Sequence, residues 1–268
     1  MPQRIPLTNF EVSVVIKIRD LYKRFKDCQV LKGLSVDIHE GETLVILGPS
    51  GVGKSVLLKH IIGITKPDRG FVEVEGVSIT DLSGTDLLKA IKRMGMLFQS
   101  GALFDSLTVA ENTGFYLTQH ADPITGKKAT KKEIAQRVDE ALEMVGLTDA
   151  YSKMPSELSG GMKKRAALAR LISYRPSIIL YDEPTTGLDP ITSMQINELI
   201  VKTQKELKAT SVVVTHDISS ALYVGDRLAL LRDGRIAHIG DPDTFIKIDD
   251  PIIEFFKKTI SQDPRTFK

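Results

Sequence analysis

The most constraining feature of this chain is the string Gly48-Pro-Ser-Gly-Val-Gly-Lys54-Ser55, which fits the pattern G-x-x-x-x-G-K-[S/T] at every position. The apolar run Thr43–Leu47 before it predicts a buried strand, and Val56–Ile62 after it predicts a helix. This strand–loop–helix context is the one that a phosphate-binding loop requires. We therefore expect a site for a nucleoside triphosphate, ATP.

The loop residues have distinct expected tasks. Glycines let backbone N–H groups turn inward around the phosphates, at a helix N-terminus whose dipole favours negative charge. Lys54 supplies a positive charge for the β- and γ-phosphates, and the Ser55 hydroxyl can ligate Mg²⁺. The expected nucleotide contacts in this loop are Gly48, Pro49, Ser50, Gly51, Val52, Gly53, Lys54, Ser55 and Val56.

Composition excludes several classes of protein. The 268 residues suit one domain with an inserted lobe. A net charge of +2 gives no argument for a nucleic-acid partner, and the single cysteine, Cys28, excludes an internal disulfide and suits a reducing compartment. No stretch approaches the roughly 18 apolar residues that cross a bilayer. We expect a cytoplasmic protein that meets a membrane only through a partner.

Short apolar runs predict the strands of the core. Val14–Ile18, Leu34–Ile38 and the alternating Gly70–Glu75 are typical of strands, the last one antiparallel. Ser177–Tyr181 and Ser211–Thr215 are continuous apolar runs, typical of buried parallel strands.

Turn and helix signals complete the outline. Asp233-Gly234, between the runs Arg227–Arg232 and Arg235–Ile239, predicts a tight hairpin. Apolar residues recur at helical spacing from Ile134 to Val145, so the segment of about 85–165 is expected to be a helical insertion.

Two adjacent carboxylates follow the predicted strand that ends at Tyr181. Ligands of open α/β sheets bind at the carboxyl ends of the strands, where Asp182 and Glu183 would lie. We expect Asp182 to be a Mg²⁺ partner, through water, and Glu183 to be the base for the water that attacks the γ-phosphate. The alternative, a solvated acidic turn, fits poorly with four apolar residues before the pair and Pro184 after it.

A second anion site is predicted far from the first. Ser159, Gly160 and Gly161 directly precede a run of helical pattern, so their N–H groups can bind negative charge. Two such sites are more than one triphosphate needs. A head-to-tail homodimer would use both, with each Ser159 facing the γ-phosphate held by the Lys54 of the other copy, so that ATP closes the pair and hydrolysis opens it.

One histidine, like Asp182 and Glu183, directly follows a predicted strand. His216 follows the apolar run Val212–Thr215, where a neutral imidazole could hydrogen-bond the γ-phosphate and steady Glu183. The other histidines, His39, His60, His120 and His238, show no metal-ligand spacing.

Taken in chain order, these motifs resemble those of the ABC-type ATPases, over nearly all of residues 14–240. The resemblance implies that Gln99 senses Mg²⁺ and the attacking water, and that Leu158–Gly161 is the signature motif. It also implies that Asp189 belongs to the D-loop, that His216 is the switch histidine, and that Phe25 stacks on adenine. Tyr22 is the second choice for that stacking role, and ordinary core packing is the alternative for both aromatics.

The expected fold class is therefore α/β: a P-loop NTPase with a RecA-like core, a mixed sheet, an antiparallel β flank and an inserted helical subdomain. The ATPase domain would span 14–240, with the helical subdomain at about 85–165 and a tail at 241–268. Two residues depart from the family pattern. Val56 replaces a common Ser or Thr that contacts the α-phosphate, and Met162 stands where Gln is commonest.

Several stretches resemble the ATPases of Mla/MCE-type phospholipid transport, above all Gln99-Ser-Gly-Ala-Leu-Phe104, which lies where the family docks its membrane partner. The resemblance implies an integral-membrane permease dimer, an MCE-type lipid-binding protein beyond the membrane, and a position on the cytoplasmic face of the inner membrane.

Two alternatives stay open at this point. The first is an importer ATPase for another substrate, and the second is a soluble ABC ATPase of iron–sulfur cluster assembly. The apolar tail, with Phe255, Phe256 and Phe267, could pack on its own body, on the second copy, or on a small cytoplasmic regulator.

Overall fold

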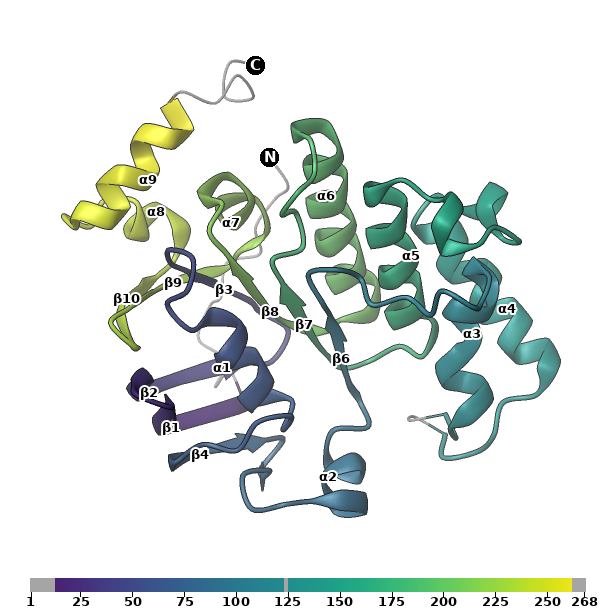
Figure 1. The fold of residues 1–268 in the computed structure, drawn as a ribbon, viewed down its shortest axis with the longest axis horizontal. Coiled ribbons are helices and arrows are strands. Elements are labelled where there is room, and N and C mark those ends of the chain that lie inside the picture. The colour runs from purple at the N-terminus through teal and green to yellow at the C-terminus, as the bar shows by residue number, and fades with distance from the viewer. Residues whose placement is uncertain (1–12, 123–124, 262–268) are drawn as a thin grey trace. The chain divides into compact units, whose positions relative to one another are not determined.

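The computed structural model describes residues 13–122 and 125–261. The chain divides into two compact units (Figure 1). Unit 1 combines the part up to Ile91 with the part from Thr210 onward, and unit 2 comprises Lys92–Ala209. Phe267 of the predicted tail lies outside the described residues.

Unit 1 contains an antiparallel sheet in the order β2-β1-β4-β5. Its strands are β1 (Val14–Phe25), β2 (Cys28–His39), β4 (Arg69–Val74) and β5 (Val77–Ser78). Ile16 pairs with Ile38 on one side and with Val74 on the other, and all three side chains are buried. The strands β1 and β2 are longer than predicted, because polar residues interrupt the apolar pattern in their added segments, 19–25 and 28–33, where Leu21 and Leu31 are nevertheless buried.

A second set of strands in unit 1 runs in the order β10-β9-β3-β8. Every residue of β3 (Thr43–Leu47) and β8 (Thr210–Thr215) is buried, as the continuous apolar runs predicted. The strand β3 pairs in parallel with β8 and with β9 (Arg227–Arg232). The helices of unit 1 are α1 (Lys54–Ile61), α2 (Gly84–Ala90), α7 (Ile218–Val224), α8 (Pro242–Phe245) and α9 (Pro251–Ser261).

The predicted hairpin near the C-terminus is confirmed. The strand β10 (Arg235–Gly240) pairs antiparallel with β9, and Arg235 lies opposite Arg232. Asp233 and Gly234 have φ angles of 50° and 75°, which is the left-handed pair that a two-residue hairpin turn requires. The tail that follows this hairpin contains α8 and α9.

Unit 2 contains two parallel strands, β6 (Met94–Leu97) and β7 (Ile178–Asp182), paired so that Leu97 lies opposite Tyr181. Its helices are α3 (Val109–Gln119), α4 (Lys131–Met144), α5 (Gly160–Ser173) and α6 (Pro190–Leu207), with short 3-10 turns at Thr148–Ala150 and Pro155–Glu157. The strand β6 was not predicted, and it lies inside the segment of about 85–165 that we expected to be helical.

Capping boxes fix where two of the helices begin. The Thr108 hydroxyl accepts from the Glu111 N–H and the Glu111 carboxylate accepts from the Thr108 N–H, and Thr130 and Glu133 repeat the exchange at α4. Such reciprocal caps satisfy N–H groups that the helix itself leaves unpaired.

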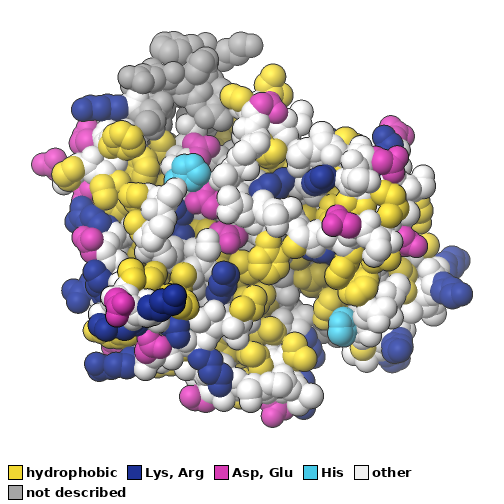
Figure 2. All heavy atoms as spheres, viewed as in Figure 1, with side chains coloured by type: hydrophobic (Ala, Val, Ile, Leu, Met, Phe, Trp, Pro, Cys, Tyr) yellow, Lys and Arg dark blue, Asp and Glu magenta, His cyan; other side chains and the backbone are white. Residues whose placement is uncertain are grey.

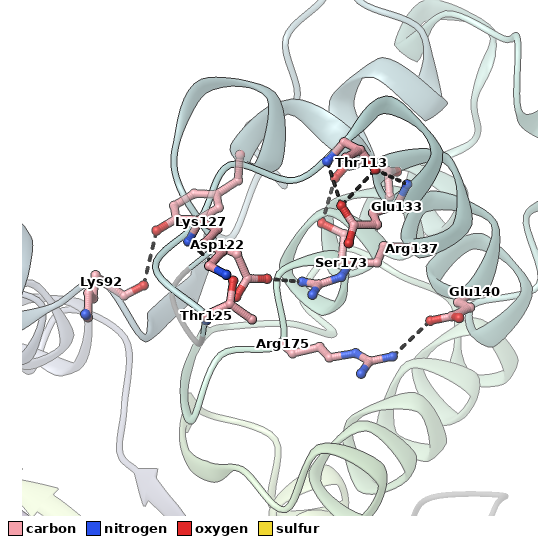
Figure 3. A network of polar contacts seen from close by, with 12 residues as sticks. Lys92, Thr113, Asp122, Thr125, Lys127, Glu133, Arg137, Glu140, Ser173 and Arg175 are labelled. Atoms are coloured by element: carbon pink, nitrogen blue, oxygen red, sulfur yellow. Dashed lines mark hydrogen bonds and ion pairs between the residues drawn. The ribbon is translucent and has the colours of Figure 1, made fainter.

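Side chains then tie the helices of unit 2 together (Figure 3). Arg137 on α4 forms an ion pair with the buried Asp122, and the Ser173 hydroxyl at the end of α5 donates to the carbonyl oxygen of Thr113 on α3. The end of α5 is therefore anchored to α3.

The visible surface in Figure 2 carries Lys and Arg side chains interspersed with Asp and Glu side chains. Among the described residues, none of the helices combines the length and apolar character needed to span a bilayer.

Candidate active site

The phosphate-binding loop follows β3 and adopts a backbone that depends on glycine. Gly53 directly precedes α1 and has a φ of 107°. A Cβ at this position would lie 2.6 Å from a methyl carbon of Val30 on β2. At Gly48 a Cβ would lie 2.6 Å from the carbonyl oxygen of Leu231 on β9. The loop is therefore held closely between β2 and β9, which leaves no room for side chains at these two positions.

The first turn of α1 brings polar groups to this loop. Its N-cap residue is Gly53, so no side chain caps the helix. The Lys54 side chain is buried, and its ammonium group donates to the carbonyl oxygens of Gly48 and Pro49 at 2.8 and 3.0 Å. Ser55 and Val56 are half-buried beside it. A lysine and backbone N–H groups gathered at a helix N-terminus form a binding site for phosphate.

His216 lies at the same sheet edge as the loop. Leu47 on β3 pairs with Thr215 on β8, so that Gly48 and His216 are the next residues of two adjacent parallel strands. The His216 side chain is exposed. Unit 1 thus brings together the phosphate-binding loop and the predicted switch histidine.

The two aromatic candidates have different environments. Phe25 is 46% exposed at the end of the β1–β2 hairpin, and the Lys23 ammonium group lies 5.4 Å from the centre of its ring. Tyr22 is only half-exposed, and its ring lies against Gly33 and beneath the Arg69 guanidinium group. Of the two aromatic residues, Phe25 is the more exposed.

Unit 2 brings together the other predicted catalytic residues. Asp182 ends β7, and the buried Glu183 follows it. Because Leu97 pairs with Tyr181, Gln99 and Glu183 occupy equivalent positions just past the ends of neighbouring parallel strands. The Gln99 side chain is exposed at this edge.

Glu183 is held by contacts that the sequence did not indicate. Its φ angle is 47°, a left-handed conformation that is uncommon for a residue other than glycine. Its carboxylate accepts a hydrogen bond of 2.9 Å from the Thr186 hydroxyl, and its carbonyl oxygen accepts one of 3.2 Å from the Lys164 ammonium group on α5. Neither Thr186 nor Lys164 was singled out in the sequence, because hydrogen bonds to particular atoms leave no pattern in it.

The predicted signature motif forms the start of α5. Ser159 is the N-cap residue, and its hydroxyl accepts from the Met162 N–H at 3.3 Å. Ser159 and Gly160 are exposed, whereas Gly161 packs so closely on α6 that a Cβ would overlap the Thr192 methyl group. The N–H groups at this end of α5 are therefore presented at an exposed surface.

Asp189 lies close to this motif. It caps α6 by accepting hydrogen bonds from the N–H groups of Ile191 and Thr192, and the Thr192 hydroxyl also donates to it. This hydroxyl holds the pKa of the Asp189 carboxyl below its usual value. Thr192 thus connects the predicted D-loop residue to the predicted signature motif, since the same side chain packs on Gly161.

The part of the chain that the structure describes contains no group of three or more His, Cys, Asp and Glu side chains able to hold a metal ion. The predicted metal ligands, Ser55, Gln99 and Asp182, instead offer a hydroxyl, an amide and a carboxylate oxygen. Oxygen atoms of this kind are what Mg²⁺ prefers.

Comparison with known proteins identifies the family. The sequence pattern of the ABC transporter family matches residues 31–186, which is more than half of the chain. The chain therefore belongs to the ABC transporter family, as an ATPase that binds and hydrolyses ATP. Its fold is similar to that of the ATP-binding cassette MJ0796, solved as a post-hydrolysis dimer bound to ADP and Pi, with a TM-score of 0.76 and 35% identity over 85% of this chain and 98% of that one.

Three curated relatives with similar sequences are named for the transport of different substrates. The intermembrane phospholipid transport system ATP-binding protein MlaF of Haemophilus influenzae is 38% identical over 95% of this chain and 94% of its own length. The probable ribonucleotide transport ATP-binding protein mkl of Mycobacterium leprae is 38% identical over 91% of this chain and 69% of its own length. The methionine import ATP-binding protein MetN of Clostridium tetani is 38% identical over 93% of this chain and 75% of its own length.

Proposed function

We propose that this chain powers a membrane transporter for phospholipids of the Mla/MCE type. The observation that carries the proposal is the similarity to MlaF, which extends over 95% of this chain and 94% of the relative. The partners we infer are a second copy of the chain, an integral-membrane permease dimer and an MCE-type lipid-binding protein. The complex would place the chain on the cytoplasmic face of the inner membrane.

The residues of unit 1 would hold the nucleotide. The loop from Gly48 to Val56 would surround the phosphates with N–H groups, and Lys54 would exchange its carbonyl partners for the β- and γ-phosphates. Phe25 would stack on the adenine, which its exposed ring supports. His216 would hydrogen-bond the γ-phosphate, which its position beside the loop supports.

The residues of unit 2 would provide the chemistry. Glu183 would accept a proton from the attacking water, and Gln99 would orient that water. Ser55, Gln99 and Asp182 would hold Mg²⁺, which neutralises charge on the β- and γ-phosphates. We infer that the phosphate-binding loop and these unit 2 residues act on one ATP, because the family pattern, residues 31–186, includes Gly48 to Val56 as well as Gln99, Asp182 and Glu183.

The signature motif would serve the partner copy. Ser159, Gly160 and Gly161 would bind the γ-phosphate held by Lys54 of the other copy, with Asp189 at the same interface. The exposure of Ser159 and Gly160 and the dimeric state of the MJ0796 structure support this arrangement. ATP would then favour the closed pair, and hydrolysis would favour its opening.

The test is to purify the full chain from membranes together with its partners and to identify them. We expect a permease and an MCE-type protein, with glycerophospholipid in the organic extract of the complex. Complex reconstituted in liposomes should move labelled phospholipid in the presence of ATP, and complex carrying Glu183→Gln should not. A permease that carries another solute, with no lipid in the complex, would contradict the proposal.

The second candidate is an importer of another substrate, and the similarity to MetN favours it. The chain covers only 75% of that relative's length, against 94% for MlaF, so we rank it second. ATP-dependent uptake of an amino acid by the same purified complex would support it.

A further inference from the structure

A buried lysine of the signature helix reaches the predicted catalytic base. Lys164 lies just over one turn after Ser159 on α5 and is only 6% exposed. Its ammonium group donates a hydrogen bond of 3.2 Å to the carbonyl oxygen of Glu183. Lysine is rarely this buried unless its charge has partners, so the contact needs an explanation beyond packing.

The acceptor of this hydrogen bond is a backbone under conformational constraint. Glu183 has a left-handed φ of 47°, a conformation that is strained for a residue with a side chain. Its carbonyl oxygen also accepts from the Thr186 N–H at 3.2 Å, and its carboxylate accepts from the Thr186 hydroxyl. Two donors on the carbonyl and one on the carboxylate therefore fix both the main chain and the side chain of Glu183.

The ammonium group of Lys164 also interacts electrostatically with the carboxylates of Asp182 and Glu183. Burial lowers the pKa of Lys164, whereas the carboxylates of Asp182 and Glu183 act on it in the opposite direction. These two carboxylates are themselves buried, and they follow β7 in the same unit. An ammonium group among buried carboxylates offsets negative charge that would otherwise be costly in this environment.

The helix that carries Lys164 is fixed along its length. Near its start, Gly161 packs on Thr192. Farther along, the Arg170 guanidinium group donates to the carbonyl oxygens of Gly101 and Ala102, and Ser173 donates to Thr113 (Figure 3). Because Ser159 caps the same continuous helix that carries Lys164, a shift of the Ser159 end would also shift Lys164.

We propose that Lys164 is a positioning residue, which holds Glu183 in its catalytic conformation and links it through α5 to Ser159. This inference rests on the proposed function, in which Ser159 faces the nucleotide of the partner copy and Glu183 acts on the nucleotide of its own copy. The binding of ATP in one composite site would then adjust the base in the other. The two sites of a dimer would respond to each other through a lysine in each chain.

The first experiment compares Lys164→Met with Lys205→Met, a matched control on the exposed face of α6. In the full-length ATPase with its membrane partners, Lys164→Met should lower kcat about tenfold, the rate equivalent of losing one hydrogen bond from an ammonium group. The KM for ATP should stay within about twofold. The control should match the wild type in both constants, and an unchanged kcat in Lys164→Met would overturn the proposal.

Cooperativity tests the link to Ser159. Hydrolysis by the wild type should show a Hill coefficient for ATP above 1, and Lys164→Met should bring it to 1. Equal Hill coefficients in the wild type and Lys164→Met would contradict the proposed link between Lys164 and Ser159.

A third measurement does not depend on hydrolysis. Amide hydrogen exchange of the peptide spanning 183–188, followed without nucleotide, should be several-fold faster in Lys164→Met than in Lys205→Met, because the Thr186 N–H bonds to the same carbonyl oxygen. Equal exchange would overturn the positioning role even if the chain proved to power another transporter. Failure of the proposed function alone would leave this difference in place.

Discussion

The ammonium group of Lys54 donates a 2.8 Å hydrogen bond to the carbonyl oxygen of Gly48, at the other end of the same loop. A second bond, of 3.0 Å, goes to Pro49. The positive charge is thus held inside the loop by carbonyl oxygens, which carry only partial negative charge. The phosphates of ATP would offer a stronger partner at the same place, since they carry full negative charges that attract the ammonium group more than carbonyl dipoles do.

The first prediction concerns this lysine. Lys54→Ala should weaken ATP binding at least about tenfold, because a hydrogen bond to a charged group contributes about 1.5–3 kcal/mol. Titration calorimetry with ATP and Mg²⁺ measures the affinity. Lys59→Ala, which removes an exposed lysine from the same helix, is the control and should bind normally. An unchanged affinity in Lys54→Ala would contradict the role of the loop.

The second prediction separates binding from chemistry. Glu183→Gln keeps the size of the side chain and its ability to accept from Thr186, but it cannot take a proton from water. It should bind ATP as the wild type does and should hydrolyse it about 10²–10⁴ times more slowly. Steady-state turnover together with ATP titration gives both quantities. Glu198→Gln on the exposed face of α6 should hydrolyse ATP normally, and comparable turnover in the two variants would disprove the assignment.

Local motifs were predictable from the sequence because each is a short run with its own physics. The phosphate-binding loop, the Asp233-Gly234 hairpin and the buried strands β3 and β8 all depend on residues within one such run. The strand β6 was not predictable. Its four residues, Met94 to Leu97, contain no β-branched side chain, and their pairing partner, β7, lies some 80 positions away in the sequence.

Contacts between residues far apart in the sequence could not be predicted either. The motif Leu158–Gly161 was recognisable, but its packing on Thr192 and the bond from Lys164 to Glu183 depend on how α5 lies against α6 and β7. The burial of Lys164 could not be predicted because it lies in the run Met162-Lys-Lys-Arg165, in which three of the four residues are charged. Such a run is typical of an exposed helix surface.

The third prediction concerns assembly. Ser159→Arg should prevent ATP-dependent pairing of two copies, because a bulky cation would occupy the space for the partner's phosphate. Light scattering after gel filtration in ATP measures the pairing. Ser159→Ala loses the same helix cap, at a cost of about 1 kcal/mol, without adding bulk, and should pair more weakly than the wild type but more strongly than Ser159→Arg. Normal pairing by Ser159→Arg would refute the composite site.

The fourth prediction is a pH dependence near α9. Burial by itself raises the pKa of Asp250, but hydrogen bonds from the Ile252 N–H, His238 and Arg232 together outweigh it and lower the pKa below 3.8. A lowered pKa in the folded state stabilises the fold above the unfolded pKa, and this contribution is lost as the pH falls through the folded value.

Asp250→Asn should therefore be less stable than the wild type at neutral pH, and the difference should shrink as the pH falls below about 4. Urea unfolding at a series of pH values measures the free energy of unfolding. Asp249→Asn, the neighbouring exposed carboxylate, should show a smaller difference at neutral pH. A constant gap between wild type and Asp250→Asn across this range would count against the ionised role of Asp250.

The fifth prediction tests the close contact between α5 and α6. Gly161→Ala should destabilise the protein by about 1–3 kcal/mol, because its Cβ would overlap the Thr192 methyl group. Gly160→Ala should cost little in folding, since the nearest atom, on Leu188, would be 3.7 Å from its Cβ. Thr192→Ser removes the methyl group but keeps the hydroxyl that donates to Asp189. The double variant Gly161→Ala/Thr192→Ser should therefore recover most of the lost stability, measured as the free energy of unfolding in urea. If it were as unstable as Gly161→Ala alone, the two helices would not meet at this pair of residues.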